Sequence, residues 1–280
     1  DHLPLLDGIN GPLHNALVNR TIQRGLEVIY LSMNRGSRDG RARALARVDG
    51  CLFIMRMPLL RREWDAWLEE IRGFPPSVLI NAGIDLPLPH VAPDDAGGAE
   101  ALVHHLAERG HHRIAVCGPI RRPTLHHASH AIRHRSILAA APGLGLAVDD
   151  LADRPYAEVA AALRAAGRER ATAVVDLSGW GLPRLCAELL RAGIDWPDGI
   201  AIATCDDPPG NCNIEPHITG VAWSMDQLVN EAFRLLEEGI AGRGRPVRVL
   251  VPEQVVARAS TAAKQPGNSH AAGPSGVART

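Results

Sequence analysis

The sequence has almost no lysine, few aromatic residues and no hydrophobic run long enough to cross a membrane. Arginine supplies nearly all of the positive charge, and Lys264 is the single lysine among 280 residues. No stretch reaches about 18 uncharged apolar residues, which excludes a transmembrane helix. The net charge of −1 gives the chain no overall attraction for nucleic acid or an anionic membrane.

Several motifs that carry chemistry are also lacking. The sequence has no GxSxG nucleophile turn, no GxGxxG after a strand and no phosphate-binding loop of the GxxxxGK type. We therefore predict that the chain is not an enzyme and needs no cofactor. The cysteines are odd in number and never spaced as CxxC, which argues against a zinc ribbon or a disulfide framework and favours a reducing compartment. They are Cys51, Cys117, Cys186, Cys205 and Cys212.

The sequence does contain short apolar runs that alternate with amphipathic segments, and this pattern indicates an α/β fold with parallel sheets. At 46% hydrophobic and 280 residues, the chain can bury two cores. We predict strands at 26–32, 49–55, 77–81, 113–118, 172–177, 199–205, 247–251 and 255–258. We predict helices at 12–24, 60–72, 96–109, 128–141, 157–167, 181–192 and 225–241. Residues 1–11 show no clear strand, and residues 263–280 have the composition of a disordered tail.

Polar side chains follow several of the predicted strands, where ligands of open α/β sheets bind. Asp206 follows the strand at 199–205, and Ser178 and Trp180 follow the strand at 172–177. Asp94 follows the extended segment 88–93, and Arg133 lies in the helix after the strand at 113–118. Carboxylates accept hydrogen bonds from hydroxyl groups, and arginine donates a fork of them. Each residue taken alone could equally cap a helix or face solvent, so the set is more informative than its members.

Three histidines at helical spacing form a second candidate. His126, His130 and His134 would lie on one helix face, where two of them could bind zinc or nickel. A catalytic zinc site needs three converging ligands, and no HExxH motif is present. We therefore favour an ordinary solvated or cleft-edge helix face and predict no metal.

The chain from about residue 12 to 262 resembles the lactose/galactose-repressor (LacI/GalR) family of bacterial transcription regulators. The resemblance rests on segments in the same order as in that family: VDGCLFI (48–54), HVAPDDAGGAEALVHHLAERGHHRIAVCGP (90–119), SHAIRHRSILAAAPGLGL (129–146), ATAVVDLSGWGLPRLCAELLRAGIDWPDGIAIATCDDPP (171–209), ITGVAWSMDQLVNEAFRLLEEGIAGR (218–243) and VARAST (256–261).

The resemblance implies a two-lobed periplasmic-binding-protein-like fold of type I, with parallel sheets flanked by helices and three crossovers. It implies an N-terminal lobe of residues 1–111 plus 218–243, and a C-terminal lobe of residues 112–217 plus 244–262. The tail 263–280 lies outside both lobes.

The resemblance also implies a function. The chain would be the effector-binding domain of a cytoplasmic repressor, would form a homodimer, and would sense a sugar-like metabolite between its lobes. It would control the binding of operator DNA through an N-terminal helix-turn-helix segment of about 60 residues, and this segment is not recognisable in this sequence. A stand-alone or exported solute-binding protein of the same fold remains the alternative.

The resemblance assigns effector contacts to particular residues. Arg133 matches the family arginine that binds effector hydroxyls, and Asp206 matches the cleft aspartate of the family. Asp94 matches the aspartate that opens the helix before the first crossover, and we expect it to contact effector as well. Ser178-Gly179 stands where Asn-Asp is common, which argues against a typical hexose. Trp223 lies on the third crossover, and with Trp180 it could form an apolar wall, although both tryptophans could instead be ordinary core residues.

Overall fold

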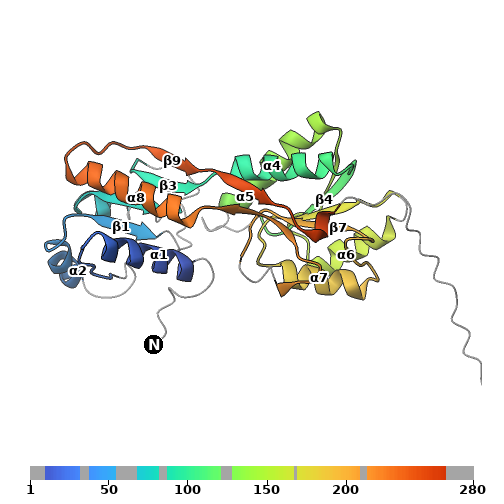
Figure 1. Ribbon diagram of the computed structural model, residues 1–280, viewed down its shortest axis with the longest axis horizontal. Coiled ribbons are helices and arrows are strands. Elements are labelled where there is room, and N and C mark those ends of the chain that lie inside the picture. The colour runs from blue at the N-terminus through green and yellow to red at the C-terminus, as the bar shows by residue number, and fades with distance from the viewer. Residues whose placement is uncertain are drawn as a thin grey trace, which may run out of the picture.

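The computed structural model describes residues 10–31, 38–54, 68–81, 87–120, 128–166, 169–208 and 213–262. Its strands form two sheets, which Figure 1 shows in two bodies side by side. The smaller sheet contains, in order across it, β1 (Cys51–Ile54), β2 (Ser77–Ile80), β3 (His90–Pro93) and β9 (Arg248–Val251). All of its neighbours pair in parallel. We call this sheet with its helices the small lobe.

The larger sheet, with its helices, forms the large lobe. Across it lie β10 (Glu253–Val256), β8 (Thr219–Trp223), β7 (Ala201–Thr204), β6 (Ala173–Asp176), β4 (Arg113–Cys117) and β5 (Ala147–Asp150). β10 pairs antiparallel to β8, and the other neighbours pair in parallel. The predicted α/β fold with parallel sheets is confirmed.

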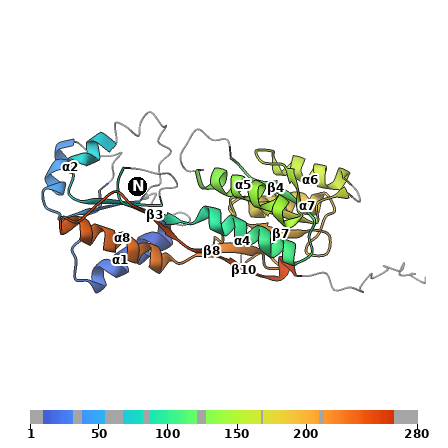
Figure 2. The ribbon, with the colours of Figure 1, turned by 90° about the horizontal axis from the view of Figure 1, so that it is seen from above.

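Two helices cover one face of the small sheet, as Figure 2 shows: α1 (Asn10–Gln23) and α8 (Met225–Ile240). Leu13 of α1 and Phe233 of α8 pack with Val78, Ile80 and Val91 of the strands. The helix α2 (Arg38–Leu45) precedes β1 in the chain.

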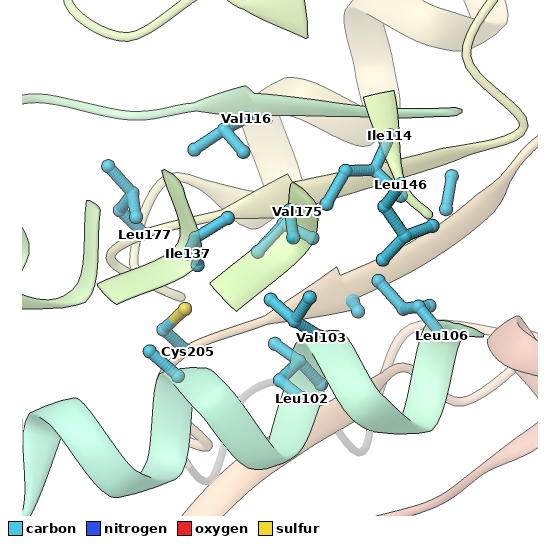
Figure 3. Packing of buried hydrophobic residues seen from close by; sticks show 14 of the residues in the cluster. Leu102, Val103, Leu106, Ile114, Val116, Ile137, Leu146, Val175, Leu177 and Cys205 are labelled. Atoms are coloured by element: carbon cyan, nitrogen blue, oxygen red, sulfur yellow. The ribbon is translucent and has the colours of Figure 1, made fainter. Parts of the chain in front are cut away.

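The large sheet is covered on both faces, which is the usual arrangement for a parallel sheet. α4 (Asp95–Glu108) and α5 (Ala128–Ala140) pack on one face, and α6 (Tyr156–Ala165) and α7 (Leu182–Arg191) pack on the other. Successive strand residues point to opposite faces. Ile114 and Val116 of β4 therefore join the core under α4 and α5, which Figure 3 shows, while Ala115 and Cys117 join the other core.

The chain crosses between the lobes three times, as the resemblance implies. The first crossing joins β3 to α4, the second joins β8 to α8, and the third joins β9 to β10 (Figure 1). Each crossing is short, because the strand or helix on one side begins within two residues of the end of the other.

One predicted strand is wrong over its described part. Residues 26–31 of the predicted strand 26–32 form no strand, and their apolar side chains are exposed. A strand is stabilised only by pairing with a neighbour, and none of the strands in the described ranges pairs with this segment. Apolar composition alone was therefore a misleading signal here.

The two lobes also divide the chain differently from the predicted boundaries at two strands. β8 lies in the large sheet, although 218–223 was assigned to the N-terminal lobe, and β9 lies in the small sheet, although 248–251 was assigned to the C-terminal lobe. Three strands, β3, β5 and β8, were not among the predicted strands, although 88–93 was expected to be extended. The predicted strand at 255–258 begins earlier as β10. Of the predicted helix 60–72, residues 68–72 are helical and the rest lies outside the described residues. Residues 1–9 and the predicted tail 263–280 also lie outside them.

Candidate functional site

A single buried arginine gathers three carboxylates at the junction of the lobes. Arg133 Nε lies 2.7 Å from Asp95 Oδ1, and its two terminal nitrogens lie 3.8 Å from Asp206 Oδ2 and 3.8 Å from Glu253 Oε1. Arg133 also donates a hydrogen bond of 3.2 Å to the carbonyl oxygen of Leu177. We call Arg133, Asp95, Asp206 and Glu253 the Arg133 cluster.

The fold brings these four residues together from four elements. Asp95 is the first residue of α4, directly after the first crossing, and Glu253 opens β10, directly after the third crossing. Asp206 follows the carboxyl end of β7, and Arg133 projects from α5. The cluster therefore lies where ligands of open α/β sheets bind, and it connects two of the three crossings.

Burial sets the electrostatics of the cluster. Glu253 has 1% of its side chain exposed and Asp206 has 19%, so Asp206 is the carboxylate that solvent reaches most easily. Burial raises the pKa of Glu253 to about 8, although Arg133 opposes this by favouring the charged form. Burial likewise raises the pKa of the Asp206 carboxyl against the same opposition. Burial disfavours the charge of Arg133, but Asp95, Asp206 and Glu253 outweigh it and raise its pKa.

Asp94 lies beside this cluster in the sequence but has a different role in the structure. Its side chain caps α4 by accepting a hydrogen bond of 3.2 Å from the backbone N–H of Gly97. The neighbouring Asp95 contacts Arg133 instead. The sequence prediction named Asp94, which caps the helix, and did not name Asp95, which contacts the arginine.

Ser178 belongs to a second buried network, centred on Asp176 at the end of β6. Asp176 accepts hydrogen bonds from the Tyr156 hydroxyl at 2.9 Å, from the Ser178 hydroxyl at 3.2 Å and from the backbone N–H of Gly179 at 2.9 Å. Ser178 Oγ in turn accepts from the N–H of Gly181. Burial raises the pKa of Asp176 to about 6, although these donors oppose the rise.

The two predicted tryptophans lie in different surroundings. Trp180 is 53% exposed. Trp223 ends β8, so it lies at the second crossing and not, as predicted, on the third. It is half-buried and packs against the core of the small lobe. Its backbone pairs with that of Glu253 in the β8–β10 register, so Trp223 lies next to the Arg133 cluster and Trp180 does not belong to it.

A further ion pair holds the segment that carries Asp206. Arg258 donates two hydrogen bonds to the carboxylate of Asp207, at 2.9 and 2.6 Å, and another to the carbonyl oxygen of Ile218. The Ser260 hydroxyl donates a hydrogen bond of 2.6 Å to the carbonyl oxygen of Ile202 in β7. The VARAST segment therefore anchors the ends of β7 and β8.

The predicted histidine face is used for structure. His130 Nδ1 lies 2.8 Å from the carbonyl oxygen of Pro119, and His134 Nε2 lies 3.0 Å from Asp150. Both histidines are buried rather than solvated. His126 lies outside the described residues. Within the described part of the chain, no group of three or more His, Cys, Asp or Glu residues could hold a metal ion.

Sequence reasoning missed Asp95 and Glu253. Glu253 stands in β10, whose residues alternate between half-buried and exposed, so a carboxylate there is an ordinary residue and the sequence gives no signal for it. The partner could not be read from the sequence, since Arg133 lies far from it in the chain.

Comparison with protein families shows which family the chain belongs to. Residues 103–261 match the periplasmic binding protein-like domain. The chain belongs to the periplasmic binding protein-like domain family. The match contains Arg133, Asp206 and Glu253, so most of the Arg133 cluster lies within the family domain.

Solved structures extend this likeness to the fold of nearly the whole chain. A LacI transcriptional regulator from a Rhodococcus species is 22% identical, with a TM-score of 0.70 over 91% of this chain and 94% of that one. A LacI family transcriptional regulator from Bifidobacterium animalis subsp. lactis is 20% identical, with a TM-score of 0.69 over 89% and 92% of the two chains. The periplasmic binding ribose operon repressor protein from Lactobacillus acidophilus is 14% identical, with a TM-score of 0.67 over 92% and 96%.

These structures share the fold of the periplasmic binding protein-like domain with this chain, which confirms the predicted two-lobed type I fold. A comparison with curated proteins gave no match. No helix in the described ranges is long and apolar enough to cross a membrane.

Proposed function

We propose that this chain is the effector-binding and dimerisation domain of a LacI-type transcriptional regulator. The Arg133 cluster carries the proposal, because it places charged hydrogen-bonding groups at the end of β7 and at two crossings between the lobes. The similar structures are LacI-type transcriptional regulators and a ribose operon repressor, and this likeness supports the same assignment.

The proposed effector is a sugar-like metabolite held between the lobes beside Arg133 and Asp206. An effector shifts a conformational equilibrium only by its difference in affinity for the two states. A tenfold difference shifts the equilibrium by about 1.4 kcal/mol. Contacts that involve both lobes increase this difference, and Asp95 and Glu253 follow crossings whose geometry would differ between lobe arrangements.

The proposed output is control of operator DNA by a homodimer in the cytoplasm. DNA would be bound by a helix-turn-helix outside these 280 residues, since the chain carries a net charge of −1. The domain would act by binding rather than by catalysis. Trp223, next to the cluster, would contribute an apolar wall to the effector site.

The test begins with a metabolite screen by thermal shift, followed by calorimetry on each compound that binds. Arg133→Ala should weaken binding at least about tenfold, because a buried hydrogen bond to a charged group contributes about 1.5–3 kcal/mol. Arg135→Ala is the matched control, because Arg135 lies on the same helix with an exposed side chain. Equal binding by wild type and Arg133→Ala would refute this site.

Intact mass and N-terminal sequencing of the native protein then separate a regulator from a solute binder. An additional segment of about 60 residues with helix-turn-helix patterning would support the regulator. A cleaved leader peptide would instead favour the solute-binding protein.

A further inference from the structure

The Arg133 cluster contains more negative than positive charge. One guanidinium faces the carboxylates of Asp95, Asp206 and Glu253, so the four groups sum to −2 when all are ionised. Arg133 favours the ionised form of Glu253, while Asp95, Asp206 and Asp94 all oppose it. Another positive charge in the cluster would therefore be stabilised.

Glu253 gives an independent indication that this cluster binds a hydrogen-bond donor. Only 1% of its side chain is exposed. Neither carboxylate oxygen of Glu253 accepts a hydrogen bond within the described part of the chain. Its carboxylate is directed at Arg133, at 3.8 Å. A buried acceptor without a donor costs about 1–3 kcal/mol, and more when it is charged.

The chain makes room for this acidic side chain. A Cβ on Gly98 of α4 would lie 1.9 Å from Glu253 Oε2, so only a glycine at this position lets the carboxylate lie against the helix. Among the described residues, no group of three or more His, Cys, Asp or Glu side chains is placed to hold a metal ion. An organic cation fits the cluster better.

We infer that the effector is a sugar-like molecule that carries a protonated amine, and that its ammonium group binds at Asp206 in the field of Glu253 and Asp95. This inference rests on the proposed function, because it names the class of effector that the same site would take. Asp206 is the point of contact because its side chain is the most exposed of the three carboxylates, at 19%.

The experiment compares amines with matched neutral compounds by calorimetry on the full chain. The amines are glucosamine, galactosamine and glucamine, and their neutral partners are N-acetylglucosamine, N-acetylgalactosamine and sorbitol. We expect at least one amine to bind at least about tenfold more tightly than its partner, because one ion pair at close range contributes on this scale.

Two variants locate the binding. Asp206→Asn should weaken the binding of an amine at least about tenfold more than it weakens the binding of the neutral partner of that amine. Glu158→Gln is the matched control, because it removes one carboxylate from the exposed face of α6 and should leave binding unchanged. Thermal melts confirm that both variants fold.

The pH dependence tests the role of Glu253. Glucamine, whose amine stays protonated, should bind more tightly as the pH rises through about 8, because Glu253 becomes ionised. Glu253→Gln should abolish this rise.

The outcomes separate this inference from the proposed function. A neutral sugar that binds as tightly as its amine, and is lost in Arg133→Ala, would overturn the amine and leave the proposed function standing. Failure of all three amines to bind would also overturn the inference. Loss of amine binding in Glu158→Gln but not in Asp206→Asn would place the ligand elsewhere and refute it.

Discussion

The buried carboxyl of Asp176 should make the stability of this protein depend on pH in a way that one substitution can reveal. Asp176 is fully buried in the large lobe, and burial raises its pKa from 3.8 to about 6. The folded state therefore holds a proton on Asp176 between these pH values that the unfolded state releases. The stability that this bound proton contributes is fully present below the pKa of Asp176 in the unfolded state. It is lost as the pH rises through about 6, the pKa of Asp176 in the folded state.

The magnitude follows from the shift. A difference of one pKa unit corresponds to about 1.4 kcal/mol, so a shift of this size contributes about 2 kcal/mol between about pH 4.5 and about pH 7.5. Asp176→Asn removes the titration and keeps the shape. Its amide oxygen can accept from Ser178 and Gly179, and its amide nitrogen can donate to the Tyr156 hydroxyl.

The assay is urea unfolding of wild type and variant at both pH values. The variant should gain about 2 kcal/mol relative to wild type on going from the lower to the higher pH. Glu158→Gln, which removes an exposed carboxylate, should show no such change. A difference between Asp176→Asn and wild type that is the same at both pH values would refute the assignment of a raised pKa.

Two further substitutions test the contacts described above. Gly98→Ala should lower the free energy of unfolding by about 1–3 kcal/mol, because the added Cβ would collide with Glu253. Gly143→Ala is the control, since a Cβ there meets no atom within 4 Å. A comparable loss in both variants, measured by urea unfolding, would contradict this prediction. Arg258→Ala should lower the free energy of unfolding by about 3–5 kcal/mol, because it leaves the largely buried Asp207 carboxylate without its bidentate partner. A loss below about 1 kcal/mol in the same assay would show that the ion pair contributes little.

Most elements of the fold could be predicted because parallel strands buried on both faces are continuous apolar runs. The strands at β4, β6 and β7 and the helices between them follow this pattern, and Gly25, Gly110 and Gly193 end helices in the left-handed conformation that glycine favours. The segment 26–31 has the same composition and forms no strand, because a strand also depends on a neighbour that composition does not reveal.

The candidate site was predictable in kind but only partly in detail. Asp206 was predicted from its place after a strand and Arg133 from its place in a helix, and the structure brings Arg133 Nη1 to 3.8 Å from Asp206 Oδ2. Asp94 and Asp95 are adjacent in the sequence, but successive residues around a helix start point in different directions, so one caps α4 and the other meets Arg133. Glu253 joined the site only through the third crossing, which sequence patterns did not place.

The three crossings have a consequence for how this chain folds during synthesis. The small sheet is not complete until β9, at residues 248–251, pairs with β3, at residues 90–93. The large sheet in turn needs β10, which follows β9 directly. Neither lobe can therefore finish folding on the ribosome before the last strands have left the exit tunnel, and both lobes must wait for the same C-terminal segment. Truncation ahead of residue 247 would leave both sheets with an unpaired edge rather than removing one lobe cleanly.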